Sequence, residues 1–274
     1  MQKVLLAGIE SAQGATKFIA TILMPRIHTP QTLTSGATIA LDAAAARHVQ
    51  VLRMQPGGEL TLFNGQGGEF EAKVLLMGRS EVQVQVGAHH AVERETARQV
   101  HLAISMPANE RMDWFIEKAT ELGAASIQPL MSERSVLRLV GERAEKKTAH
   151  WQAAAIAACE QCGRNRIPIV YAPVSYQKWL LAGIESAQSA TESIAFSQPS
   201  KAILSLHPTA IRAADWAAKH AGNPLLCLAG PEGGFSPAEE QAALDAGFAP
   251  ITLGERVLRS ETAPLAALAL WMLS

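Results

Sequence analysis

The chain has 274 residues, of which 48% are hydrophobic and 18% are charged, and its formal net charge is −1. These values are typical of a folded protein with a large core and exclude a disordered or collagen-like chain. A net charge near zero excludes a uniformly basic surface, so a nucleic-acid partner would have to be bound by local positive patches. Three cysteines favour a reducing compartment over a disulfide framework, and we expect a cytoplasmic location.

The N-terminal 23 residues precede MPRIHTPQTL, where the domain-like part of the sequence begins at Met24. They contain LLAGIESAQ at 5–13, which recurs unchanged at 180–188. Their polar interruptions make a poor signal peptide, and no apolar run anywhere reaches the roughly 18 residues that a membrane span needs. We expect residues 1–23 to be an extension outside the natural fold, and the segment around 180–200 to be a peripheral insertion.

Residues 24–94 show the pattern of a small β-domain. The runs ELTLFNG, GEFEAKVLLM and SEVQVQVGA alternate apolar and polar residues and are separated by glycine-rich turns. This pattern predicts a β-barrel of antiparallel strands, with one helix in DAAAARHVQVLRM.

Residues 95–274 alternate between apolar strand candidates and helical stretches. The strand candidates are VHLAISM, SIQPLM, IPIVYA, AILSLH, PLLCLAG and PITLG. The alternation predicts an α/β domain with a mostly parallel sheet. One helix is expected between Asn109, a predicted N-cap, and Gly123, a predicted stop; another is expected within GERAEKKTAHWQAAAIAACEQCG.

Two loops of this second region contain glycine where a strand leads to a helix. In LAGPEGGFSPAEE, residues 228–240, Ser236, Pro237 and Glu239 predict a capping-box helix start. The loop therefore follows a parallel strand, where α/β folds commonly bind ligands. It lacks the Lys-Ser/Thr of a P-loop and the GxGxxG pattern, which excludes both nucleotide motifs.

The second loop, in ITLGERVLRSETA, places Arg256, Arg259 and Glu261 among apolar residues. Two interpretations are open. Arg259 could form a structural ion pair with Glu261 or Glu232, or the two loops could form one pocket wall with Arg259 facing a substrate.

The blocks GPEGGFSPAEE and LGERVLRSETA together resemble the C-terminal signature of SPOUT-class RNA methyltransferases. More narrowly, they resemble the bacterial family that methylates N3 of a uridine in 16S ribosomal RNA. The resemblance extends through ERMDWFIEKATELGAASIQPLMSERS, WQAAAIAACEQCGRNR and HVQVLRMQPGGELTLFNGQGGEF, and covers most of the chain from Met24.

The resemblance implies a PUA-like RNA-binding β-barrel followed by an α/β domain with a C-terminal trefoil knot, in a homodimer. It implies S-adenosylmethionine as cofactor and 16S ribosomal RNA, within the small subunit, as partner. The cofactor-binding residues that it implies are Leu228, Gly230, Pro231, Glu232, Gly233, Gly234, Leu253, Gly254, Val257, Leu258, Thr262 and Ala263.

Methyl transfer to uracil N3 requires loss of the N3 proton and stabilisation of the resulting anion. An arginine suits the second task, and we predict Arg259 for it, with Arg164 as a second candidate. Glu261 or Glu232 could accept the proton or anchor the loop backbone. The candidate RNA-binding residues are Arg26, His28, Arg47, His48, Arg53 and Arg134.

Two other functions use the same scaffold: a noncatalytic RNA-binding assembly factor, and a SPOUT enzyme acting on a ribose hydroxyl or on transfer RNA. No metal site is expected, because the Cys159–Cys162 pair has no second ligand pair at a suitable spacing.

Overall fold

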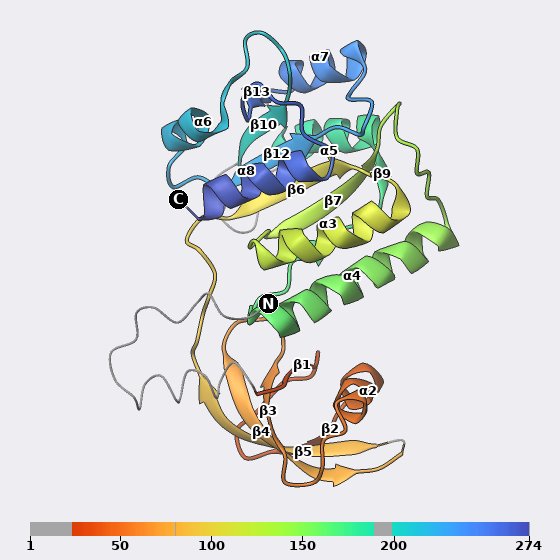
Figure 1. Ribbon diagram of the computed structural model, residues 1–274, viewed down its shortest axis with the longest axis vertical. Helices are drawn as coiled ribbons and strands as arrows, with labels where there is room; N and C mark the ends of the chain where they lie inside the picture. The colour runs from red at the N-terminus through yellow and green to blue at the C-terminus, as the bar shows by residue number, and fades with distance from the viewer. Residues whose placement is uncertain (1–23, 80, 189–198, 274) are drawn as a thin grey trace. The chain divides into compact units, whose positions relative to one another are not determined.

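The computed structural model describes residues 24–79, 81–188 and 199–273 of the chain (Figure 1). The backbone divides into two compact units, with the boundary between Glu93 and Arg94. The predicted extension, residues 1–23, lies outside the described residues. None of the described helices is both long enough and apolar enough to cross a membrane.

The first unit is built on a five-stranded sheet in the order β1-β3-β4-β5-β2. Its strands are β1 (Arg26–His28), β2 (Thr38–Ala40), β3 (Glu59–Phe63), β4 (Glu69–Met77) and β5 (Val82–His90). Strands β2 to β5 pair antiparallel, as predicted, but β1 pairs parallel with β3. The parallel pair is possible because β2 and helix α2 (Ala43–Val51) lie between the two strands in the chain and provide the long crossover.

The second unit contains the predicted parallel sheet, in the order β11-β13-β10-β12-β6-β7-β8, with β9 paired to β7. Its strands are β6 (Val100–Ser105), β7 (Ser126–Met131), β8 (Ile169–Val170), β9 (Val174–Ser175), β10 (Ser200–Leu204), β11 (Ile211–Arg212), β12 (Leu225–Ala229) and β13 (Ala249–Thr252). Every pair of neighbouring strands is parallel. The carboxyl ends of β10, β12 and β13 therefore lie at one edge of the sheet.

Helices cover both faces of this sheet (Figure 1). Side chains of α3 (Asn109–Glu121), α4 (Glu142–Cys162), α6 (Ala213–Lys219) and α8 (Thr262–Met272) form the core on one face. Side chains of α5 (Tyr176–Gln188) and α7 (Pro237–Asp245) form a smaller core on the other. Burial on both faces explains why the strands are almost continuously apolar.

The ends of the helices test the capping predictions. The N-cap of α3 is Ala108, one residue before the predicted Asn109, while Gly123 follows the helix with a φ of +96°. The start of α7 is confirmed: Ser236 Oγ accepts from the Glu239 amide at 3.3 Å, and the Glu239 carboxylate accepts from the Ser236 amide at 3.0 Å. The predicted long helix is α4, and it ends at Gly163 in the left-handed conformation.

The segment predicted as a peripheral insertion contributes to the fold at both ends. Leu180 is buried in the core beside α7, and Ser200 begins β10 within the sheet. The prediction that residues 180–200 are peripheral is therefore wrong at these ends, while residues 189–198 lie outside the described part of the chain. Tyr176 and Leu180 are four residues apart in α5, so they lie on the same face of the helix, and both are buried in this core.

Asp113 links the two long helices α3 and α4. Its carboxylate accepts hydrogen bonds from Trp151 Nε1 at 2.7 Å and from His150 Nε2 at 3.1 Å, and Lys147 Nζ lies 3.6 Å away. Burial raises the pKa of Asp113, but the hydrogen bonds from His150 and Trp151 and the charge of Lys147 outweigh this and leave the pKa below its usual value of 3.8.

We expect Asp113→Asn to lower the free energy of unfolding at neutral pH, because Asn keeps an acceptor for Trp151 but loses the charge. A carboxylate whose pKa is lowered in the folded state stabilises the fold above its unfolded pKa, and this contribution disappears as the pH falls through the folded pKa. Urea unfolding from pH 7 to pH 3 measures the difference between variant and wild type, which should shrink at the acid end. A difference that does not change with pH would contradict this account.

Candidate functional site

A cavity of about 630 Å³ lies at the carboxyl ends of β10, β12 and β13. Both glycine-bearing loops line it, so the structure supports the interpretation that they form one pocket wall. Nine of the predicted cofactor-binding residues line this cavity: Gly230, Pro231, Glu232, Gly234, Leu253, Gly254, Val257, Leu258 and Ala263. Such a volume is in the range of sites for small molecules and cofactors.

Three of the predicted cofactor-binding residues lie elsewhere. Leu228 is fully buried in the core beneath α5 and α7, because side chains alternate along β12 and it is Ala229 that reaches the cavity. Gly233 is exposed and lies against the side chain of Arg134. Thr262 lines a smaller neighbouring cavity of about 270 Å³.

The glycine-rich loop between β12 and α7 needs its glycines for two different reasons. A Cβ at Gly230 would lie 3.2 Å from the ring of Phe235, so a side chain at residue 230 would require the ring to shift by a few tenths of an ångström. Gly234 has a φ of +66°, and its amide donates to Pro231 O at 2.9 Å, which closes a turn. The turn brings Pro231, Gly234 and Phe235 to the same cavity.

The same loop is held from outside by the segment that follows β7. Arg134 donates from Nη1 to Gly233 O at 2.8 Å and to Phe235 O at 3.4 Å. The Glu239 carboxylate, which caps α7, also accepts from the Glu133 amide at 2.7 Å. Arg134 thus binds loop carbonyl groups while it is itself exposed, and its RNA contact stays a prediction.

The second loop, between β13 and α8, begins and ends with local hydrogen bonds. The Gly254 amide donates to Thr252 Oγ1 at 3.2 Å, and Gly254 has a φ of +116°. At the other end, Arg259 O accepts from the amides of Thr262 and Ala263 at 2.9 and 3.0 Å. Between them the loop carries Arg256, Val257 and Arg259, all exposed and all lining the cavity.

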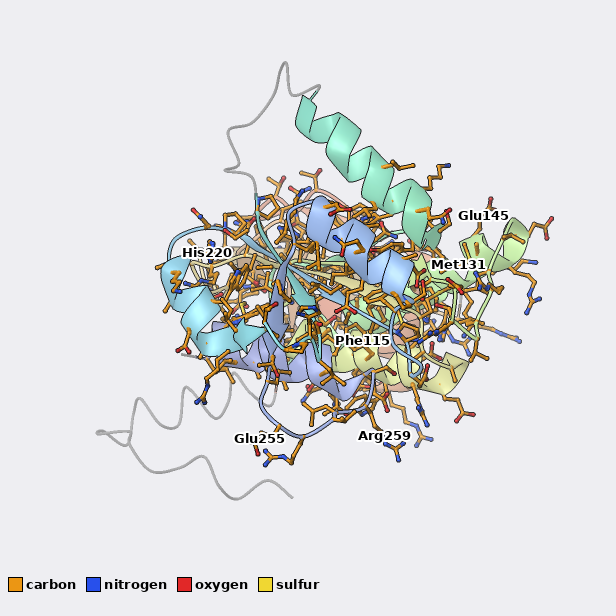
Figure 2. The ribbon with its side chains drawn as sticks, turned by 90° about the horizontal axis from the view of Figure 1, so that it is seen from above. Phe115, Met131, Glu145, His220, Glu255 and Arg259 are labelled. Atoms are coloured by element: carbon orange, nitrogen blue, oxygen red, sulfur yellow. The ribbon has the colours of Figure 1, made fainter. Side chains whose placement is uncertain are left out.

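The ion-pair interpretation of Arg259 is not supported. The carboxylates of Glu232 and Glu261 face Arg111 of α3, at 3.3 Å from Nη1 and 3.8 Å from Nε respectively. Within the described ranges, no ion pair includes Arg259. Figure 2 shows Arg259 and Glu255 on this loop with their side chains directed away from the body of the domain. Arg259 is thus an exposed cation at a cavity, and its contact with a substrate stays a prediction.

Glu261, the predicted proton acceptor, is buried beside the main cavity and lines the smaller one with Arg111 and Trp114. Its Oε2 accepts from Ser260 Oγ at 3.1 Å. This bond and the ion pair with Arg111 support the interpretation that Glu261 anchors the loop. Proton transfer by Glu261 stays a prediction.

Several residues that line the main cavity were not predicted from the sequence: Arg111, Leu204, Ser205, Leu206, Ala229, Phe235, Glu240, Ile251, Thr252, Arg256 and Ser260. Some of these are next to predicted residues in the chain. Ser205 and Leu206 follow β10, and only the order of strands in the sheet, which local patterns do not encode, brings them to the site.

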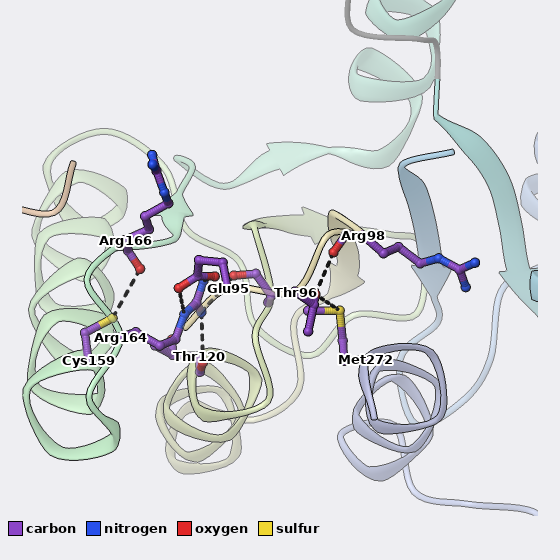
Figure 3. A network of polar contacts seen from close by, with 9 residues as sticks. Glu95, Thr96, Arg98, Thr120, Cys159, Arg164, Arg166 and Met272 are labelled. Atoms are coloured by element: carbon purple, nitrogen blue, oxygen red, sulfur yellow. Dashed lines mark hydrogen bonds and ion pairs between the residues drawn. The ribbon is translucent and has the colours of Figure 1, made fainter. Parts of the chain in front are cut away.

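Arg164, the second catalytic candidate, does not line the cavity. Its guanidinium is buried and donates to the Glu95 carboxylate at 2.9 and 2.6 Å, and to Thr120 O and Ala124 O at 2.8 and 3.0 Å (Figure 3). It binds carbonyl groups at the C-terminal end of α3, where a cation is favourable. Its role in this structure is to join α3 to the segment before β6.

The candidates in the β-domain fall into two groups. Arg26 is nearly buried, pairs with Glu69 at 2.6 Å and stacks on Phe63, 5.0 Å from the ring centroid, so its cation already has a structural partner. His28 contacts the same ring. In contrast, Arg47 and Arg53 are exposed, and His48 is half-buried on α2. We retain Arg47, His48 and Arg53 as candidates for RNA contacts.

The described residues contain no group of three or more His, Cys, Asp or Glu side chains that could hold a metal ion. Cys159 and Cys162 are free thiols, and Cys159 Sγ donates to Arg166 O at 3.7 Å.

We expect Arg164→Met to lower the free energy of unfolding by about 3 kcal/mol, because it removes the buried partner of Glu95 and the donors to two helix-end carbonyl groups. Arg143→Met, on the exposed surface of α4, is the matched control and should change the value by less than about 0.5 kcal/mol. Chemical denaturation of the two variants checks this. Equal stabilities would show that Arg164 does not have a structural role.

Known families match both units of the chain. A model described as RNA methyltransferase domain matches residues 94–272, and one described as RNA methyltransferase PUA domain matches residues 41–87. The chain is 30% identical over 246 residues to ribosomal RNA small subunit methyltransferase E of Buchnera aphidicola subsp. Schizaphis graminum, covering 89% of this chain and 94% of the relative. It is 31% identical over 250 residues to the Bacillus subtilis protein of the same name, covering 88% and 91%.

Two solved structures are similar to this chain, and each of them covers most of its length. Ribosomal RNA small subunit methyltransferase E of Neisseria gonorrhoeae, bound to S-adenosyl methionine, has a TM-score of 0.80 and 37% identity, covering 90% of this chain and 96% of that one. A putative methyltransferase of Legionella pneumophila in complex with the cofactor SAM has a TM-score of 0.79 and 36% identity, with the same coverage. The chain, with its PUA domain, parallel α/β domain and cavity between two glycine-bearing loops, belongs to the ribosomal RNA small subunit methyltransferase E family.

Proposed function

We propose that this protein transfers a methyl group from S-adenosylmethionine to N3 of a specific uridine in 16S ribosomal RNA. The observation that carries the proposal is the single cavity lined by both glycine-bearing loops, in a chain whose relatives of 36 and 37% identity were solved with this cofactor bound. The base and atom that are methylated rest on the resemblance described above.

The cavity fits a nucleoside cofactor in size and in chemistry. Its apolar side chains include Leu204, Leu253, Val257 and Leu258, and its loops place backbone groups of Gly230 and Gly254 at the surface of the cavity. Apolar walls with a few polar groups are typical of cofactor sites, and glycine lets backbone N–H and C=O groups approach a base edge closely. When bound, the cofactor supplies an electrophilic sulfonium methyl group.

The chain's own task is to make N3 of the uracil a nucleophile. As N3 loses its proton, negative charge develops on the neighbouring carbonyl oxygens, and a cation placed there stabilises it. Arg259 is suited to this because it is exposed at the cavity, has no acidic partner in the described residues and stays charged. For the proton, Glu232 is an acidic group that lines the same cavity, with Arg111 beside it.

RNA binding is assigned to local cations rather than to net charge. Arg47 and Arg53 of the first unit are exposed, and Arg111, Arg256 and Arg259 line the cavity of the second. Phosphate contacts of this kind weaken steeply as salt rises.

We extend the proposal to a small-subunit substrate, a homodimer in the cytoplasm, and a C-terminal trefoil knot formed by the two loops that share the cavity.

Two measurements test the proposed function. Calorimetric titration with S-adenosylmethionine should show binding, and binding should raise the melting temperature of the protein. Incubation with small ribosomal subunits from a strain that lacks the enzyme, followed by mass analysis of the nucleosides, should then show 3-methyluridine. Cofactor binding without methylation would favour the assembly-factor alternative, and a methylated ribose or transfer RNA would favour the other SPOUT activity.

We expect Arg259→Ala to lower the rate of methyl transfer by two orders of magnitude or more, while the affinity for S-adenosylmethionine changes little. The reason is that Arg259 acts on charge that develops only in the transition state, and loss of one such group typically costs a factor of about 100 to 1,000. Single-turnover kinetics and calorimetry separate the two effects. Arg143→Ala, on the exposed face of α4, controls for loss of surface charge; a normal rate in Arg259→Ala would remove this residue from the mechanism.

A further inference from the structure

The carboxylate of Glu240 lines the main cavity without a cationic partner. Glu240 belongs to α7 and is half-buried. The other acidic residue of the cavity, Glu232, pairs with Arg111. In the part of the chain that the structure describes, no lysine, arginine or histidine forms an ion pair with Glu240. A half-buried carboxylate without a cationic partner is available to a ligand that can donate a hydrogen bond to it.

Ser205 fixes one of the two carboxylate oxygens. The Ser205 hydroxyl accepts from the His207 amide at 2.9 Å, so its own proton is free to be donated, and it is donated to Oε1 of Glu240. The Ser205 amide donates in turn to Ile251 O at 3.0 Å, which fixes this residue at the junction of β10 and β13. Oε2 of Glu240 has no hydrogen-bond partner among the described residues.

Glu240 and the cations of the cavity come from different sides of the sheet. Glu240 is carried by α7, which packs on the same face as α5. The cations come from α3 and from the loop that leads into α8, and both of these helices pack on the opposite face. An RNA phosphate is attracted to the arginine side and repelled by Glu240. The ligand group that meets Glu240 is therefore not a phosphate but a hydrogen-bond donor, and the cofactor of the proposed function carries such donors.

We propose that Glu240, held by Ser205, is a specificity-determining residue that accepts a hydrogen bond from a donor group of the cofactor. This inference rests on the proposed function. S-Adenosylmethionine offers three groups of the required chemistry: the ammonium of its amino-acid part, the hydroxyls of its ribose and the amino group of its adenine. Any of these groups would replace the water that a carboxylate loses in the cavity, and a charge-assisted bond of this kind makes a large contribution to affinity.

The test compares Glu240→Gln with wild type, using calorimetric titration of two probes. Gln keeps the shape of the side chain and removes its charge. S-Adenosylmethionine should bind about tenfold more weakly or worse to the variant. If 5′-methylthioadenosine, which lacks the amino-acid part, is also weakened, the donor belongs to the nucleoside part, as a ribose hydroxyl or the adenine amino group. If its affinity is unchanged, the donor is the ammonium. Both results support the inference.

Two further variants make the test specific. Glu255→Gln removes an exposed carboxylate from the loop beside the cavity and should bind both probes as wild type does. Ser205→Ala should weaken S-adenosylmethionine in the same direction as Glu240→Gln, and it serves as the test if Glu240→Gln does not fold. The inference is overturned if these two cavity variants bind both probes with wild-type affinity. If wild type itself does not bind S-adenosylmethionine, the proposed function fails together with it, and the two failures are thereby distinguished.

Discussion

The site depends on one packing constraint, the contact between the ring of Phe235 and the backbone of Gly230. The ring lies this close because residue 230 has no Cβ, which would come within 3.2 Å of it and require the ring to shift. With the ring in place, the chain turns sharply after β12 and enters α7, whose first turn is held by Ser236 and Glu239. The turn and helix start then bring both Gly234 and Glu240 to the same cavity.

Glu239 connects this turn to the rest of the domain. One oxygen of its carboxylate completes the capping box, and the other accepts from the Glu133 amide after β7. Tyr176 donates to the carbonyl oxygen of Glu239 at 2.7 Å; its burial, followed by the charges of Glu239 and Glu240, raises the pKa of this phenol, which keeps it a donor. Three separate segments thus fix the position of α7, and a rigid support of this kind favours precise placement of ligand-binding groups.

Features that depend on neighbours in the chain could be predicted, and features that depend on the order of strands could not. The α7 cap and the stop at Gly123 are written in a few adjacent residues. Ser205 reaches the cavity only because β10 lies between β12 and β13. Arg164 shows the same limit, because an arginine in a polar segment has the same local pattern whether it is exposed or buried against Glu95.

Arg111 explains how Arg259 stays available. An exposed arginine beside two acidic residues would ordinarily pair with one of them, yet Glu232 and Glu261 both face Arg111 instead. Arg111 is carried by α3, whose position is set by core packing and by the bonds of Asp113 to α4. Arg111, on a helix that the core positions, therefore pairs with a carboxylate from each loop. Arg259 is left without an acidic partner among the described residues, which supports the proposal that it stabilises charge developing on the substrate.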